Sequence, residues 1–519
     1  MAGDAIGGSP SGGRQGQRSA AEVWRIRLLV LTVMGVGAVL RLVNLNAVGL
    51  NSDEVVYAGQ AASLAGNPVY VDIFPVFRAH PMLVQSLLSI VYADGEQDSG
   101  GRVIIGLIGV ATIGLTYLLG RELYGPGVGI VAAALLAVMP YHVIVSRQIL
   151  LDAPMVFFAT LALLCLAKFG GSKRLVWMIA AGGAMGLTAL AKESSLVLLG
   201  GVYAFLALTP AIRRSIVASA CGGAVLVAVF AVHPLTQALA GRASTGSSYL
   251  VYQLLRRPNH GWTFYAETVP MAIGPLVLIA AVLLFVRARG NVGWRETLLV
   301  SWIVVPVLFF TLWPVKGYQY LLPIAPAVAV LAVKGLQRLP TQWGEPVAGW
   351  LRAVRRLGPR VLATSAVLVS LVLATAPPLL GTSGITFLAG TGGVPGGREA
   401  GRWIRANTPE GSTLMTIGPS MSNIMKFYGH RPSYGLSVSP NPLHRNPAYP
   451  PLTNPDRQMK QGDLQYVVWD SFSAARSPHF SDYLLQLTDR YHGRLVHTEY
   501  TTLHDGTREP IIKIFAVRP

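Results

Sequence analysis

Charged side chains are scarce in this sequence. Asp, Glu, Lys and Arg make up 13% of its residues, whereas hydrophobic residues make up 52%. A soluble globular domain carries roughly 25% charged residues, so the shortage excludes an ordinary soluble protein and indicates a membrane protein. Cysteine is scarcer still, because Cys165 and Cys221 are the only two and both lie in apolar segments. The sequence therefore indicates neither a disulfide framework nor a cysteine-based metal site.

Carboxylates are few compared with cations. The chain has 24 Asp and Glu against 42 Lys and Arg, which gives a formal net charge of +18. Such an excess can indicate nucleic-acid binding. Here the cations follow the loops of a membrane protein instead, so we expect no nucleic-acid partner.

Long apolar segments recur along most of the chain. About eleven are long enough to cross a bilayer by the rule of roughly 20 residues per crossing, and we place them at 24–43, 102–120, 127–145, 149–167, 175–191, 195–210, 215–235, 269–286, 296–313, 319–337 and 361–380. The first lacks a clear small-residue cleavage site, so we expect an uncleaved span and no secretory signal. Residues 1–20 are rich in Gly, Ser and Arg and predict a disordered cytoplasmic tail.

The cations between these segments are distributed unevenly. If the N-terminus is inside, the inside loops hold Arg121, Lys168, Lys173, Arg174, Arg213, Arg214, Arg287, Arg289, Arg295, Lys334, Arg338, Arg352, Arg355, Arg356 and Arg360. The short outside connections hold few, chiefly Arg147, Lys192 and Lys316. The asymmetry predicts a multi-pass protein of the cell membrane with a cytoplasmic N-terminus and an extracytoplasmic C-terminal domain.

Two adjacent carboxylates, Asp53 and Glu54, follow the first apolar segment where the chain leaves the membrane. A charge near hydrocarbon costs several kcal/mol, roughly, unless it is solvated or paired. Residues 54–65 predict a short helix with Ser52 or Asp53 as its N-cap. An ionised carboxylate at that position can act as a general base or hold a metal. Alternatively, Asp53 is only a helix cap and Glu54 is solvated.

The first outside loop, residues 44–101, is longer than a connection requires. It contains Arg78, His80 and Pro81, followed by an apolar stretch at 82–92 that is too short to span and fits an interfacial helix. Loops of this length are usually functional.

Other ionisable residues mark the remaining outside connections. Asp152 lies five residues after Arg147, and a structural pair between them is one interpretation. Lys192 lies in a very short turn, where it can meet lipid phosphate or extend to the headgroups. The loop 236–268 is basic and aromatic, which fits carbohydrate or phosphate binding, or an interfacial aromatic belt. A further outside turn contains Lys316 and Tyr320.

The composition changes after the last apolar segment. From about residue 392, helix-like segments (397–406, 420–427, 480–491) alternate with strand-like ones (413–417, 464–469, 495–501, 511–517). They predict a small α/β domain with a loop or flap at 432–458, and we divide the chain into a tail (1–20), a membrane domain (21–383) and this domain (384–519). A glycine-rich nucleotide-binding loop before a helix is missing here, so no sugar-nucleotide or ATP site is expected.

The outside motifs, in chain order, are Asp53-Glu54-x-x-Tyr57, Arg78-x-His80-Pro81, the region of Arg147 and Asp152, Lys192, and Tyr318-x-Tyr320-Leu321-Leu322-Pro323. Together they resemble the motifs of the C-type glycosyltransferases, specifically the protein-mannosyltransferase and aminoarabinose-transferase-like group. The resemblance covers about residues 20–340, and where relatives often have two prolines this chain has Pro81 alone. It implies a polytopic α-helical membrane fold of about eleven helices with an extracytoplasmic α/β domain.

The resemblance also implies a reaction, in which a hexosyl or pentosyl group moves from a polyprenyl-phosphate-linked donor to a glycan, lipid or protein acceptor. Asp53 is the candidate base, and Glu54 would orient the acceptor or the backbone. The candidates for binding the donor phosphate are Arg78, Lys192, Lys316 and Tyr320, with Tyr57, His80, Arg147 and Asp152 in support. Direct displacement would invert the anomeric centre. The resemblance implies no certain cofactor, and it leaves open whether the reaction needs a divalent metal ion.

Two other functions fit parts of the pattern. A transporter or flippase of a lipid-linked sugar would place charges mid-membrane and show inverted repeats or broken helices. A non-catalytic membrane scaffold would merely present the C-terminal domain. The long outside loops favour an enzyme.

Overall fold

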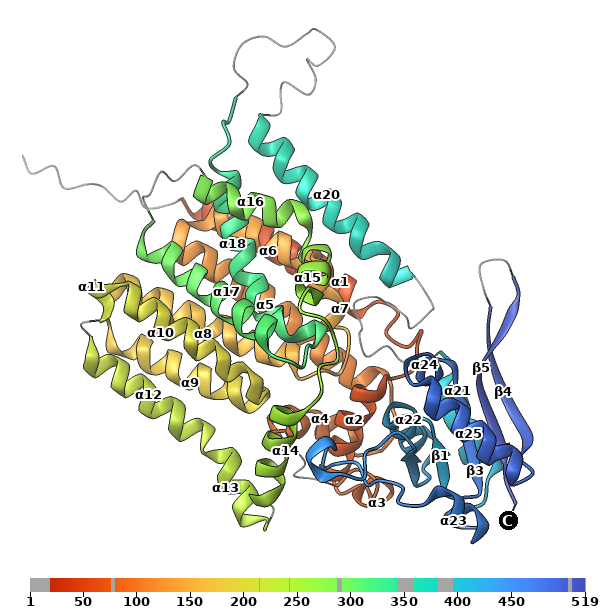
Figure 1. The fold of residues 1–519 in the computed structure, drawn as a ribbon. Helices are drawn as coiled ribbons and strands as arrows, with labels where there is room; N and C mark the ends of the chain where they lie inside the picture. The colour runs from red at the N-terminus through yellow and green to blue at the C-terminus, as the bar shows by residue number, and fades with distance from the viewer. Residues whose placement is uncertain are drawn as a thin grey trace, which may run out of the picture.

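The computed structural model describes residues 19–75, 80–213, 215–241, 243–286, 292–342, 358–380, 395–502 and 506–518. It confirms a multi-pass helical membrane protein with a C-terminal mixed β-sheet domain (Figure 1). Most of the expected tail, the expected domain boundary at 383–384, and Arg78 lie outside the described residues.

The membrane part has helix at each of the eleven expected positions. Its elements are α1 (Ala20–Leu42), α5 (Ser99–Tyr124), α6 (Pro126–Val138), α7 (Pro140–Val145), α8 (Asp152–Ser172), α9 (Leu175–Ala191), η1 (Glu193–Leu196), α10 (Val197–Leu208), α11 (Pro210–Arg213), α12 (Ile216–Phe230), α13 (Val232–Leu239), α14 (Ala243–Leu255), α15 (Phe264–Ile273), α16 (Pro275–Val286), α17 (Trp294–Leu312), η2 (Tyr318–Ile324), α18 (Ala325–Leu336) and α20 (Pro359–Leu380).

Seven segments of the described chain are long and apolar enough to cross a membrane: α1, α5, α8, α12 with α13, α17, η2 with α18, and α20. An eighth is added if α15 and α16 form one span, although they meet at an angle of 96°. The bend follows from the local sequence, because Gly274 adopts φ 101 and Pro275 begins the second helix. The α6, α9 and η1–α10 segments are apolar but shorter.

A buried arginine donates to backbone carbonyls at the break between α6 and α7. Arg41 of α1 donates to the carbonyls of Ala137 at 2.9 Å and Leu136 at 3.2 Å. In a membrane such groups have to be satisfied inside the protein. This cation therefore supports the irregular end of a helix.

The first outside loop folds into α2 (Ser52–Leu64), α3 (Pro68–Val71) and α4 (Leu83–Tyr92). The helices expected at 54–65 and within 82–92 are confirmed, but the expected N-cap of α2 is wrong. Asn51 is the cap, and its side-chain oxygen accepts from the backbone N–H groups of Asp53 and Glu54. Asp53 therefore lies inside the first turn.

The C-terminal part consists of α21 (Gly397–Asn407), β1 (Leu414–Thr416), α22 (Pro419–Gly429), β2 (Ser433–Gly435), η4 (Pro442–His444), α23 (Pro455–Lys460), β3 (Tyr466–Asp470), α24 (Ser471–Arg476), α25 (Pro478–Arg490), β4 (Arg494–Thr502) and β5 (Arg508–Ala516). The sheet has the order β2-β1-β3-β5-β4, in which β2, β1 and β3 are parallel and β5 pairs antiparallel with both β3 and β4. The Pro- and Asn-rich segment 432–458, expected as a loop, contains the short strand β2 and the helix η4.

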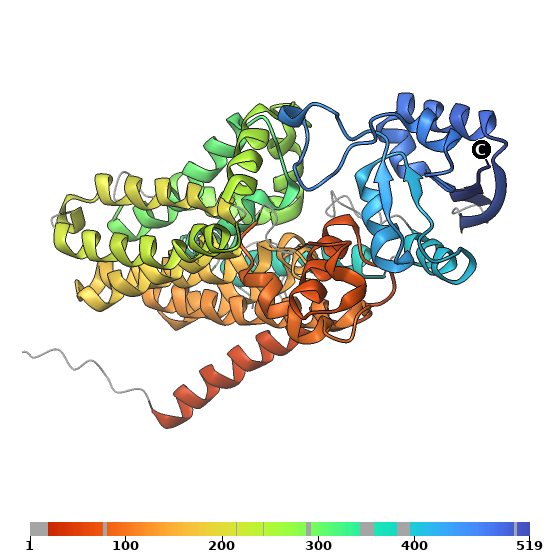
Figure 2. The same ribbon diagram turned by 90° about the horizontal axis from the view of Figure 1, so that it is seen from below.

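The sheet domain packs on the first outside loop. Helix α22 contacts α2, and η4 reaches α14 of the membrane part. Figure 2 shows this domain at one end of the molecule, with the segment around η4 extended toward the membrane helices. The start of α2 thus lies where the two parts meet.

Candidate active site

Hydrogen bonds of the Asn51 side chain fix the start of α2, where Asp53 lies. The Asn51 side-chain oxygen accepts from Asp53 N at 3.0 Å and from Glu54 N at 3.1 Å, and its amide nitrogen donates to Gln148 Oε1 at 2.9 Å. Asp53 consequently lies at the positive end of the helix dipole, where a carboxylate is favoured.

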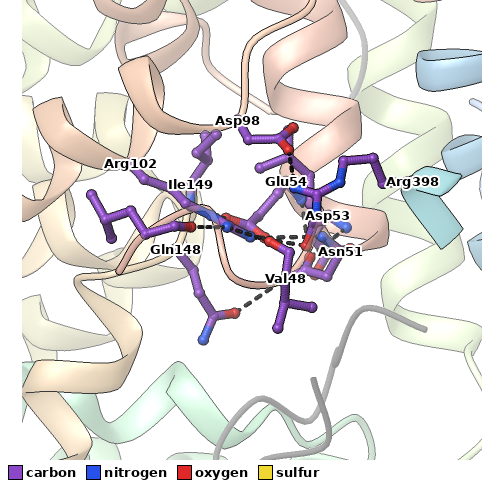
Figure 3. Close-up of polar contacts among 12 residues, drawn as sticks. Val48, Asn51, Asp53, Glu54, Asp98, Arg102, Gln148, Ile149 and Arg398 are labelled. Carbon is purple, nitrogen blue, oxygen red and sulfur yellow. Dashed lines mark hydrogen bonds and ion pairs between the residues drawn. The ribbon is translucent and has the colours of Figure 1, made fainter. Parts of the chain in front are cut away.

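Glu54 is committed to structural contacts. It is 1% exposed, and each of its oxygens accepts two hydrogen bonds. Arg102 donates from Nε to Oε1 at 2.7 Å and from Nη2 to Oε2 at 2.6 Å, while Asn51 N and Ile149 N donate at 2.9 Å each (Figure 3). This uses the acceptor capacity of the carboxylate. The geometry favours an orienting role for Glu54, because its carboxylate has no acceptor position left for a substrate.

Asp53 is different, because no described residue donates a hydrogen bond to its half-buried carboxylate. Burial raises the pKa of this carboxyl above its usual value. The charges of Lys192, His80 and Arg256 oppose that shift by favouring the ionised form, whereas Asp152 adds to it. Within the described part of the chain, the carboxylate therefore has no hydrogen-bond donor and is close to three basic groups.

The first of these basic groups, Lys192, is buried and paired. Its Nζ donates to both oxygens of Asp152 at 2.8 Å and lies 4.9 Å from the centre of the Tyr320 ring. The interpretation that Asp152 pairs with Arg147 is wrong, because Arg147 donates to the Leu40 carbonyl at 2.8 Å. Since α8 and α9 form a hairpin, the first residue of α8 meets the residue after α9.

The second basic group, His80, is fixed by residues from three other segments. Its Nδ1 lies 2.9 Å from Glu193 Oε1, and its Nε2 lies 3.4 Å from the Tyr249 hydroxyl. The Tyr57 ring packs edge-on against it at 6.1 Å between centroids. Desolvation and the nearby Asp53 raise the pKa of Tyr57 well above its usual value, so this phenol stays protonated.

Lys316 lies in a separate, tightly bonded turn. Its backbone exchanges two hydrogen bonds of 2.8 Å with the Asn259 side chain, and its Nζ donates to the Trp313 carbonyl at 2.9 Å. Tyr265 closes the same turn with a hydrogen bond to the Gly317 carbonyl at 3.1 Å. The loop expected to bind carbohydrate or phosphate is thereby tied to the turn that carries Lys316.

The structure brings together six of the residues selected from the sequence and separates others. Asp53, Tyr57, His80, Asp152, Lys192 and Tyr320 form the cluster. Glu54 and Arg147 face other partners. Sequence reasoning missed Glu193, although it directly follows Lys192, and Arg102, a charge at the start of an apolar helix that needed a partner. Among the described residues, no three His, Cys, Asp or Glu side chains gather as ligands for a metal ion.

Comparisons with known proteins agree with this architecture. Residues 79–236 match the family described as dolichyl-phosphate-mannose-protein mannosyltransferase. The structure is similar to that of ArnT from Cupriavidus metallidurans in the apo state, with a TM-score of 0.69 and 14% identity over 96% of this chain and 98% of that one. The chain has a C-type glycosyltransferase fold.

A second relative extends the comparison within this fold. The archaeal oligosaccharyltransferase AglB from Archaeoglobus fulgidus, in complex with an inhibitory peptide and a dolichol-phosphate, has a TM-score of 0.57 and 14% identity over 95% of this chain and 74% of that one. A search of curated proteins returned no match. At 14% identity, the likeness shows the fold alone.

Proposed function

We propose that this chain is a glycosyltransferase that moves a sugar from a polyprenyl-phosphate donor to a hydroxyl of a glycan, lipid or protein acceptor. The observation that carries the proposal is the Asp53 carboxylate, which accepts no hydrogen bond from the described residues and lies beside the basic groups of Lys192, His80 and Arg256. The family match supports it, as does the similarity, at a TM-score of 0.68, to ArnT from Cupriavidus metallidurans bound to undecaprenyl phosphate.

In the proposed reaction, Asp53 takes the proton of the acceptor hydroxyl. The oxygen then forms a bond to the anomeric carbon of the donor sugar, and the bond from that carbon to the phosphate oxygen breaks. The bonding electron pair leaves with the polyprenyl phosphate, whose added charge needs stabilisation. Displacement from the opposite face inverts the anomeric centre.

Lys192 is the strongest candidate for binding the departing phosphate. Asp152 fixes its Nζ at 2.8 Å from each carboxylate oxygen, and an ammonium group has three donors, so one can still reach a ligand. Tyr320 and Arg256 lie close enough to act on the same charges. Lys316 and Arg78 complete the proposed set, although Arg78 lies outside the described residues.

We further propose that these groups and the sheet domain face the exterior. The support is the concentration of cations in the loops assigned to the inside and the position of the cluster on loops assigned to the outside. Residues 21–383 would then perform the transfer, and residues 384–519 would form the extracytoplasmic domain. Membrane lipid is the remaining partner.

A transporter or flippase is the second candidate, because the 96° bend between α15 and α16 is a broken helix of the kind that transporters use. The two candidates differ in their product. A flippase returns the same lipid-linked sugar, whereas the proposed enzyme creates a new glycosidic bond and releases polyprenyl phosphate.

The deciding experiment compares envelope glycans and lipids, by mass spectrometry, between a strain lacking the gene and strains expressing the parent or Asp53→Asn. We expect one sugar modification to disappear on deletion, to return with the parent, and to form about 10²–10⁴-fold more slowly with Asp53→Asn. The matched control is Asp72→Asn, which changes an exposed carboxylate in the same loop. Transfer by a folded Asp53→Asn protein within about threefold of the parent would exclude Asp53 as the base.

A further inference from the structure

Residues 49–52, which lead into α2, contact the sheet domain at almost every position. A Cβ added at Gly49 would lie 2.7 Å from Arg398 Cβ, which shows how closely the two backbones approach. Leu50 N donates to the Tyr428 hydroxyl at 2.7 Å. Ser52 Oγ accepts from the Asn423 amide at 3.4 Å. Tyr428 and Asn423 both belong to α22, so one helix of the sheet domain borders the cap of α2.

Tyr428 joins this segment to the membrane part as well. Its ring is fully buried, and its hydroxyl donates to Asp98 Oδ1 at 2.6 Å. The other oxygen of Asp98 accepts from Arg398 Nη1 at 2.7 Å. Asp98 lies at the start of α5, one turn before Arg102 (Figure 3). The Tyr428 hydroxyl therefore links Leu50 to the start of α5, the helix that carries Arg102.

Arg102 also binds the connection between α1 and α2, and its bonds there are made to carbonyl groups. Arg102 donates to the carbonyls of Leu45 at 2.6 Å, Val48 at 2.8 Å and Gly49 at 3.1 Å. It has no acceptor to offer an N–H group. Among the described residues, Tyr428 supplies the acceptor for the Leu50 N–H. A buried amide without an acceptor is costly, so removal of this hydroxyl has to loosen the segment.

We propose that Tyr428 is a positioning residue, which lets the sheet domain hold the catalytic carboxylate in place. The inference rests on the proposed role of Asp53. Leu50 precedes the Asn51 cap directly, and the cap orients the first turn that contains Asp53. Displacement of Leu50 therefore reaches Asp53 through only three consecutive peptide bonds. Misplacement of a catalytic group by about 1 Å can cost as much as 10²-fold in rate.

The first test needs no substrate. Amide hydrogen exchange is measured on the purified full-length protein and on Tyr428→Phe, which removes the hydroxyl alone. We expect roughly tenfold faster exchange at Leu50 and in the following cap, because one hydrogen bond is lost. The matched control is Tyr434→Phe in the same domain, whose hydroxyl has no hydrogen-bond partner among the described residues. Unchanged exchange in residues 45–56 of Tyr428→Phe would overturn the inference.

The second test uses the product identified in the deletion strain. We expect Tyr428→Phe to lower kcat about tenfold while KM for the donor stays within about twofold, since the phosphate-binding groups are untouched. Tyr434→Phe should match the parent. Faster exchange with an unchanged kcat would show that Tyr428 stabilises the fold without positioning Asp53. If deletion of the gene removes no product, the proposed function fails, and the exchange experiment alone still decides whether α22 orders the cap.

Discussion

Asp53 and Glu54 are neighbours in the sequence with opposite tasks in the structure. Glu54 accepts four hydrogen bonds and is closed to ligands, whereas Asp53 accepts none from the described residues. The difference follows from the helix, because adjacent positions point about 100° apart around its axis. The sequence could predict that one carboxylate orients and the other reacts, but it could not locate Arg102, which decides the assignment.

The raised pKa of Asp53 predicts the pH dependence of transfer. The base has to be ionised, and its ionised fraction falls as the pH drops through the pKa, so kcat/KM should fall on the acid side at a higher pH than for an exposed aspartate. Arg256 favours the ionised form. In Arg256→Met the acid limb should therefore move to higher pH, whereas Arg257→Met, a neighbouring change, should leave it in place. If the acid limb of the pH profile stays at the same pH in Arg256→Met, a residue other than Asp53 is the base.

Among the described residues, two ion pairs have both side chains buried, and each predicts how a substitution changes stability. The first joins α2 to α5 through Glu54 and Arg102, whose side chains are 1% and 8% exposed. Glu54→Gln keeps the shape but leaves the arginine without a countercharge, so thermal unfolding should report a loss of about 3–5 kcal/mol. Glu96→Gln removes the ion pairs of Glu96 with two exposed arginines, and it should lower the free energy of unfolding by no more than about 1 kcal/mol. A fully stable but inactive Glu54→Gln protein would instead assign Glu54 a chemical role.

The second pair joins α8 to α9 through Asp152 and Lys192. Asp152→Asn should destabilise the protein by about 3–5 kcal/mol, because it leaves a buried ammonium group unpaired. The double variant Asp152→Asn with Lys192→Met should regain much of this stability. It should still fail to bind the donor lipid, measured with undecaprenyl phosphate, because the proposed phosphate ligand is gone. Undiminished lipid binding by the double variant would remove Lys192 from that role.

At the level of elements, the sequence predicted helices well and their partners poorly. Apolar periodicity is local, so α1, α5, α8 and the strands β1, β3, β4 and β5 could be located from it, whereas β2 lies in a segment expected as a loop. The pairing of Asp152 depends on which helix ends meet in space, and the nearer Arg147 in sequence was a poor guide. The hairpin of α8 and α9 was the missing constraint, since a two-residue turn forces their far ends together.

Orientation is a property of the whole molecule, and chemical labelling tests it. With both native cysteines replaced by alanine, Ala475→Cys, at an exposed position of α24, should react with a membrane-impermeant thiol reagent in intact cells. Ser172→Cys, exposed at the end of α8, should react only after lysis. The expectation follows from the asymmetric loop cations. The reverse pattern would invert the topology and place the cluster in the cytoplasm.

The hydrogen bond between Leu50 and Tyr428 spans 378 residues of chain. At about 5–20 residues per second, a ribosome needs roughly 20–75 s to make the second partner after the first. Contacts of such long separation close late, because the intervening loop has to be ordered first. During synthesis, the Leu50 amide therefore lacks its Tyr428 partner while the membrane helices insert. In the proposed orientation, the segment that carries Asp53 reaches its final geometry only when the C-terminal domain has been translocated and has docked.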